Sequence, residues 1–166
     1  MYKFIFPFVF MLSACSISTV DLLTDYQGSD KANIRVANTL PIIFIEPVDP
    51  IKNCVRKDLT KSLVSSNIIG YRPVASKKIP GMTPSNKLNT NNVLEFSIKS
   101  NQVYQLFFYE ESIATPHKYY LKTAHFIPKT GKDYDITIRR NSDIVIREVN
   151  TREDLQIYKE IQDCSE

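Results

Sequence analysis

The second half of the chain, from Val93 to Val149, alternates apolar and polar residues, and this alternation constrains the fold more than any other feature. Successive side chains of a β-strand point to opposite faces, so a period of two indicates strands with one buried face. Leu94, Phe96 and Ile98, for example, alternate with polar residues. The almost uniformly apolar segment Val103–Tyr109 is instead typical of a central strand that is buried on both faces.

Short polar turns separate these segments, and their spacing predicts the architecture. Lys129–Lys132 and Asn141–Asp143 contain the residues that favour turns. Strands at this spacing favour an antiparallel β-sandwich of about seven strands, of the transthyretin or immunoglobulin type. The strands are expected at 32–36, 42–46, 93–98, 103–109, 119–127, 133–139 and 144–149.

Two segments have a helical pattern instead. Asp49 and Pro50 offer an N-cap oxygen and a favourable φ at the first helical position. Apolar residues then recur at every fourth position up to Leu63. A shorter apolar stripe over 155–161 follows a start that resembles a capping box. We therefore expect one or two short helices beside the strands.

Length and composition indicate one domain of ordinary globular character. The 166 residues are 43% hydrophobic and 23% charged, which is too apolar for general disorder. A net charge of +3 provides no dense basic surface, so nucleic acid is not an expected partner. The polar segment Lys77–Asn92 has no period and is interpreted as one long surface loop, either a flexible insert or a functional element.

The first fifteen residues have the pattern of an export signal. Lys3 precedes an apolar run from Phe4 to Leu12, and the small residues Ser13 and Ala14 follow. This order is typical of a secretory signal peptide. The apolar run is about half as long as the roughly 20 residues that a transmembrane helix requires.

The sequence Leu12-Ser13-Ala14-Cys15 resembles the lipobox of bacterial lipoproteins. The resemblance implies that residues 1–14 are removed and that Cys15 is acylated, with palmitate among the chains that anchor the protein in the bilayer. Ser16 is similar to the residue that directs such proteins to the outer membrane, on its periplasmic side. Residues 15–31 are then a lipidated tether, and residues 32–166 a single domain.

Two cysteines remain, Cys54 and Cys164. In an exported chain, two such cysteines are most simply interpreted as one disulfide, which here would close a loop of about 110 residues. His117 and His125 do not have the spacing to either cysteine that a zinc site requires. We expect a disulfide that joins the two predicted helices, and no metal site.

The sequence contains little that indicates catalysis. It has no nucleophile elbow, no paired zinc-binding histidines and no glycine-rich phosphate loop. His125 is expected to be a partly buried, hydrogen-bonded strand residue, and His117 a solvated loop residue. Glu110 and Glu111 would point to opposite faces of a strand, so they cannot act together on one substrate. We therefore expect neither a catalytic residue nor a cofactor.

An aromatic set in the same region could provide a binding platform, but strand parity favours core and cross-strand packing. The set comprises Tyr104, Phe107, Phe108, Tyr109, Tyr119 and Tyr120.

Three further stretches resemble motifs of small outer-membrane lipoproteins of Gram-negative bacteria: 26–28, 32–36 and 126–134. The resemblance implies that the last stretch is a strand–turn–strand corner, with Pro128 and Gly131 in the turn and Phe126 and Tyr134 packed at its ends. It implies no catalytic residue.

The export signal, the predicted disulfide and the scarcity of catalytic groups together favour a non-enzymatic protein that contacts another envelope protein as a structural or adaptor subunit. The alternative is a small-ligand or inhibitor-type binding module that uses the 77–92 loop and neighbouring tyrosines. A concave apolar pocket beside that loop would favour the binding module, and an exposed hydrophobic strip would favour the adaptor.

Overall fold

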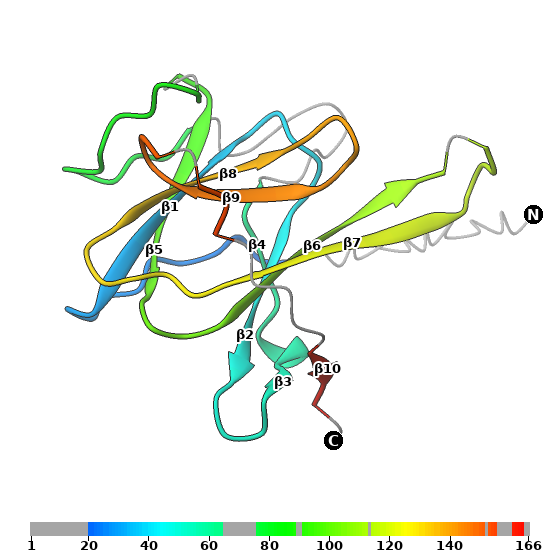
Figure 1. Ribbon diagram of the computed structural model, residues 1–166, viewed down its shortest axis with the longest axis horizontal. Coiled ribbons are helices and arrows are strands. Elements are labelled where there is room, and N and C mark those ends of the chain that lie inside the picture. Colours follow the sequence, from blue (N-terminus) through cyan, green and yellow to red (C-terminus); the bar gives the residue numbers. More distant parts are fainter. Residues whose placement is uncertain are drawn as a thin grey trace, which may run out of the picture.

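The computed structural model describes residues 20–64, 76–88, 91–112, 114–151, 153–155 and 161–164. These residues contain ten strands and one short 3-10 helix, arranged as two β-sheets that pack against each other (Figure 1). The predicted β-sandwich is therefore confirmed. None of the helical structure in this part of the chain is long and apolar enough to cross a bilayer.

The first sheet has the strand order β5-β1-β8-β9. Its strands are β1 (Lys31–Ala37), β5 (Val93–Lys99), β8 (Asp133–Ile138) and β9 (Ile144–Glu148). β1 pairs antiparallel with β5 but parallel with β8. The expectation of purely antiparallel pairing was wrong at this point. β1 and β8 lie about 100 residues apart, so no short turn dictates their relative direction.

The second sheet has the order β10-β3-β2-β6-β7, and β4 also pairs with β2. Its longer strands are β2 (Phe44–Asp49), β6 (Tyr104–Glu111) and β7 (Tyr119–Phe126). The short strands are β3 (Cys54–Val55), β4 (Lys61–Ser62) and β10 (Gln162–Asp163). β10 runs parallel to β3, so this sheet is mixed as well. β6 and β7 form a long antiparallel hairpin that projects from the body of the molecule (Figure 1).

The core lies between the two inner faces. Ile34, Phe96 and Tyr134 from the first sheet and Leu106 and Phe126 from the second belong to one buried cluster. As predicted, the alternation places apolar residues of each strand toward this cluster. The first five residues of β6 are buried on both faces, which confirms the interpretation of that segment as a central strand.

The predicted corner between the sheets is present. The chain leaves β7 at Phe126, turns through Pro128 and Gly131, and enters β8. Gly131 has a φ of 72°, where a residue with a side chain would be strained. The rings of Phe126 and Tyr134 pack edge to face, with their centroids 6.0 Å apart, and the Tyr134 hydroxyl accepts a hydrogen bond from the Lys129 amide at 2.8 Å.

The predicted helix over 50–63 is absent, which is the main error of the sequence interpretation. The Asp49 carboxylate does accept hydrogen bonds from the amides of Ile51 and Lys52, but it closes a tight turn instead of starting a helix. β3 follows this turn, then the 3-10 helix η1 (Lys57–Leu59) and β4. Ile51, which the helical pattern placed on the buried stripe, is 93% exposed.

The second predicted helix lies largely outside the described residues, since 156–160 are not among them. The residues that follow form β10.

Candidate functional site

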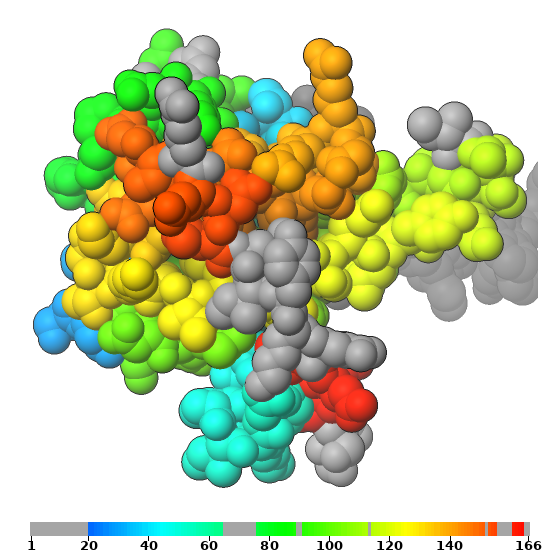
Figure 2. Space-filling view, viewed as in Figure 1, coloured from blue at the N-terminus to red at the C-terminus, as the bar shows by residue number. Residues whose placement is uncertain are grey.

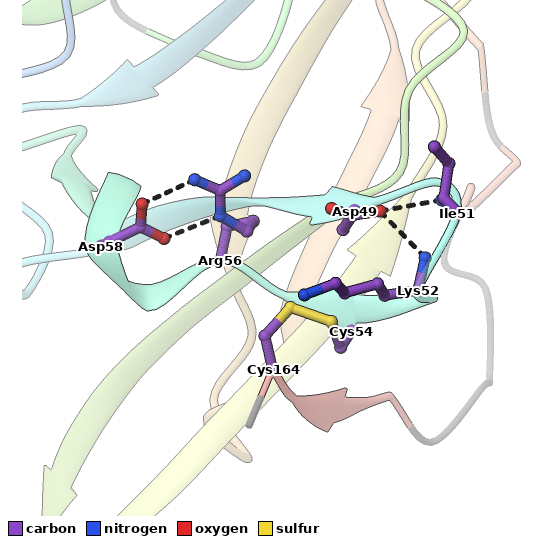
Figure 3. The surroundings of a disulfide bond; sticks show 7 residues. All are labelled: Asp49, Ile51, Lys52, Cys54, Arg56, Asp58 and Cys164. Atoms are coloured by element: carbon purple, nitrogen blue, oxygen red, sulfur yellow. Dashed lines mark hydrogen bonds and ion pairs between the residues drawn. A yellow bond between two sulfur atoms is a disulfide. The ribbon is translucent and has the colours of Figure 1, made fainter. Parts of the chain in front are cut away.

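The predicted disulfide is present between Cys54 and Cys164, whose Cα atoms lie 4.8 Å apart (Figure 3). It joins β3 to the residue after β10, so it links two short strands and not two helices. The Cys164 amide also donates a hydrogen bond to the Val55 carbonyl. The disulfide therefore holds residues 162–164 against β3 of the second sheet.

Cys15 and the signal peptide, residues 1–14, lie outside the described residues, which begin at Val20. The lipidation of Cys15 and the location in the outer membrane remain predictions from the sequence.

A buried ion cluster occupies the outer face of the first sheet. Arg35 lies at the centre of β1 and is only 2% exposed. Its Nε atom donates to Glu95 on β5 at 2.9 Å, and its Nη1 atom donates to Asp135 on β8 at 3.1 Å. The strand register places these three residues side by side across three strands. Both carboxylates are buried as well.

The polar segment predicted as a surface loop covers this cluster. The Ile79 amide donates to Glu95, the Ser85 hydroxyl donates to Asp135, and the Thr83 carbonyl accepts a hydrogen bond from Arg35. Over 76–88 the loop is therefore docked on the sheet. The sequence analysis did not identify Arg35. The available signal was one basic residue, Arg35, and two acidic residues, Glu95 and Asp135, at polar positions of three predicted strands.

A small cleft lies beside this loop, and all the residues that line it are of polar or charged types. Its volume is about 160 Å³, and Asp135, Arg147 and Glu148 are among the residues that line it. It does not have the apolar lining that the ligand-binding hypothesis required beside the loop.

A chain of buried polar side chains lies on the outer face of the second sheet. His125 is 7% exposed, and its Nε2 atom lies 2.9 Å from the Gln105 amide oxygen. The Gln105 amide nitrogen donates to Glu46 at 3.1 Å, so His125 donates to the Gln105 oxygen and is the Nε2–H tautomer. Burial lowers the pKa of His125. The expectation of a hydrogen-bonded strand histidine is confirmed, as is that of an exposed His117.

The aromatic set of the sequence analysis divides into two groups. Tyr104, Phe107 and Phe108 are buried, as predicted. The expectation of core packing was wrong for Tyr109, Tyr119 and Tyr120, which are 57%, 57% and 47% exposed. Tyr109 and Tyr119 lie on the outer face of the second sheet, which the first sheet does not cover, and Tyr120 lies on the inner face of the distal half of the hairpin, which extends beyond the first sheet (Figures 1 and 2).

Tyr109, Tyr119 and Leu121 point to the same outer face of the hairpin and form the exposed surface that we call the hairpin strip, whereas Tyr120 points to the opposite face. Tyr109 lies opposite Leu121 in the strand register. An aromatic row leads from the body to the strip, because Phe107 stacks on Phe44 and meets the edge of Tyr109. β7 is the last strand of its sheet. The strip is thus an apolar surface on an edge strand, of the kind that mediates contacts between proteins.

The described residues bring no catalytic constellation together. Glu110 contacts Ser142 and Lys122, whereas Glu111 accepts a hydrogen bond from the His117 amide, so the two carboxylates have separate partners as predicted. No group of three or more metal-binding side chains occurs among the residues described.

The comparisons with known proteins found no matching family model, no similar curated protein and no similar solved structure.

Proposed function

We propose that this chain is a lipoprotein anchored through Cys15 to the periplasmic side of the bacterial outer membrane, where it acts as a non-enzymatic adaptor. The hairpin strip is the surface that contacts another envelope protein. The anchor rests on the signal-peptide pattern and the lipobox resemblance of residues 1–15. The observation that carries the adaptor role is the exposure of three large apolar side chains on one face of a projecting hairpin.

The composition of the hairpin strip supports a protein partner. Tyrosine is enriched at protein interfaces because its ring provides a large apolar area and its hydroxyl a hydrogen bond. The strip has two tyrosines and one leucine, and the exposed Glu111 lies opposite Tyr119 at its end, which matches an apolar centre with a polar rim. Since β7 is an edge strand, a partner strand could also pair with its backbone.

Photo-crosslinking in cells tests the adaptor role. A photoreactive amino acid replaces Tyr109 or Leu121 in the full chain, and the matched control carries it at Ile51, which is also exposed but lies in the turn after β2. We expect one discrete adduct from the two hairpin positions and none from Ile51. Equal adducts from all three positions, or no protein adduct from the hairpin, would contradict the proposal.

Radioactive palmitate tests the anchor separately. We expect the wild-type chain to incorporate label and Cys15→Ala to incorporate none. We also expect globomycin, which blocks lipoprotein signal peptidase, to leave the leader attached. An unlabelled wild-type chain found in the cytosol would refute the location whatever the crosslinking result.

A further inference from the structure

A large cavity lies at one open end of the sandwich. Its volume is about 610 Å³, within the range of roughly 300–1,000 Å³ that small-molecule sites have. Residues from both sheets line it, together with the segment 23–28 and Leu59 from the 3-10 helix. None of the residues that line it belongs to the hairpin strip, so ligand binding here is independent of the proposed adaptor role.

The interior of the cavity is apolar because it reaches the hydrophobic core. Ile45 on β2, Ile98 on β5 and Tyr104 on β6 line it and also belong to the buried core cluster. Leu23 and Pro47 extend this apolar wall toward the opening. A hydrocarbon chain placed here would exchange water for contacts with the core.

One wall of the cavity is fixed before any ligand binds. The Leu23 amide donates to the Ser62 carbonyl of the second sheet, and the Tyr26 amide donates to the Ser97 carbonyl of the first. The Tyr26 hydroxyl donates to Asp30 at 2.7 Å. The Tyr26 ring covers Gly28, where even an added Cβ atom would overlap it. A wall that is held in this way lowers the entropy cost of binding.

The polar groups of the cavity favour an anionic end on the ligand. Lys99 is exposed and lines the cavity. The carboxylate that also lines it, Asp25, is already paired with Lys77 at 2.6 Å. Burial raises the pKa of Tyr104 to about 12. It therefore stays protonated and can donate to a ligand oxygen.

We infer that this cavity binds a fatty acid, with its alkyl chain against Ile45 and Ile98 and its carboxylate at Lys99 and the Tyr104 hydroxyl. An apolar interior with one lysine and several hydroxyl groups, that of Tyr104 among them, matches a ligand that has a single hydrocarbon chain and one anionic end. A compact polar ligand would leave the apolar walls in contact with water.

A photoreactive dodecanoate, with a diazirine on its alkyl chain, tests this inference. The probe is added to the purified full chain in non-ionic detergent, with Cys15→Ala so that no acyl group on that cysteine competes. We expect crosslinks to concentrate on the peptide that contains residues 23–28 and on the peptide that contains Tyr104. Leu59→Trp places an indole in the cavity and should reduce the crosslinks about tenfold, equivalent to two methylenes kept out.

Two controls make the outcome decisive. Ile51→Trp adds the same side chain at an exposed position in the turn before β3 and should leave the crosslinks unchanged. Lys99→Glu should reduce crosslinking of the acid about fivefold but not that of the matching alcohol probe, which has no charge. Circular dichroism verifies that each variant is folded. Crosslinks that are insensitive to Leu59→Trp, that concentrate on the hairpin strip or that do not form at all would overturn the inference.

Discussion

The buried ion cluster leads to the sharpest stability prediction, which concerns Arg35→Ala. The Arg35 guanidinium donates to Glu95, to Asp135 and to the Thr83 carbonyl, at 2.9, 3.1 and 2.8 Å. Removing it leaves two buried carboxylates without their central cation, with only the half-exposed Lys78 ammonium 3.4 Å from Glu95, and breaking a buried ion pair in this way costs about 3–5 kcal/mol. Because domains are stable by only about 5–15 kcal/mol in total, this is a large fraction of the free energy of unfolding.

Urea unfolding at pH 7, followed by circular dichroism, measures the loss. Arg56→Ala is the matched control, because Arg56 also pairs with a carboxylate, that of Asp58, but both side chains are largely exposed. Exposed pairs contribute about 0–1 kcal/mol, so this control should be close to the wild type. Hydrogen exchange should also become faster over 76–88 in Arg35→Ala, since that loop docks through the cluster.

A rescue experiment tests the physical cause. If the loss arises from uncompensated negative charge, adding Glu95→Gln and Asp135→Asn to Arg35→Ala should restore a large part of the stability. This triple variant also provides a folded protein to measure if Arg35→Ala alone does not fold. The reasoning is refuted if Arg35→Ala costs no more than Arg56→Ala, or if the amide substitutions destabilise the protein further.

Three further predictions follow from single features of the fold. Cys54→Ser, or reduction of the wild type, should lower the free energy of unfolding by about 4–5 kcal/mol because the bond closes a loop of 110 residues, and an unchanged urea midpoint would contradict this. Gly131→Ala should cost about 1 kcal/mol by thermal unfolding, from its φ of 72° alone, because nothing lies within 4 Å of an added Cβ; a stabilised variant would show that this backbone is not strained. Burial lowers the pKa of His125, so the folded state binds the proton less readily than the unfolded chain. The free energy of unfolding should therefore fall as the pH drops below about 6.5, and His125→Gln should remove this slope between about pH 7 and 5.

The strands of the second half were predictable because their signal is local. Where one face of a strand packs on a core, alternation records which face it is, and β5, β8 and β9 lie close to their predicted ranges. The turn at Lys129–Lys132 was predictable for the same reason, since Gly131 allows the backbone angle that this turn requires, whereas the corner over 126–134 was implied by the resemblance to small lipoproteins. The pairing of Cys54 with Cys164 followed from there being two cysteines left after Cys15.

The segment 50–63 shows why local signals can mislead. Apolar residues at every fourth position fit a helix, but the same positions also fit short strands whose alternate residues are buried. Val55 and Leu63 are indeed buried, although as parts of an extended chain that pairs with or packs beside β2. An aspartate before the segment does not decide the matter, because it can equally well close a turn.

The candidate sites were less predictable than the fold. Arg35 occupies a polar position of an alternating strand, which normally faces solvent, and it is buried because the 76–88 loop returns to cover it. Tyr109 and Tyr119 are aromatic residues that usually pack, yet they are exposed because no described element covers the outer face of the distal hairpin. Both outcomes depend on which other segment covers the outer face of a strand. The residues of the strand itself do not contain that information.

The order of residues alone therefore determined that this chain forms strands, where most of them turn and which two cysteines join. The strands and turns follow from the alternation of side chains along a strand and from the backbone angles that turn residues favour, which are local properties. The disulfide follows from the number of cysteines. Only the tertiary structure decided that β8 lies parallel to β1, that an arginine is buried between two carboxylates and that a cavity opens beside Tyr26. These depend on contacts between segments far apart in sequence, whose free energies are set by the packing of the whole domain.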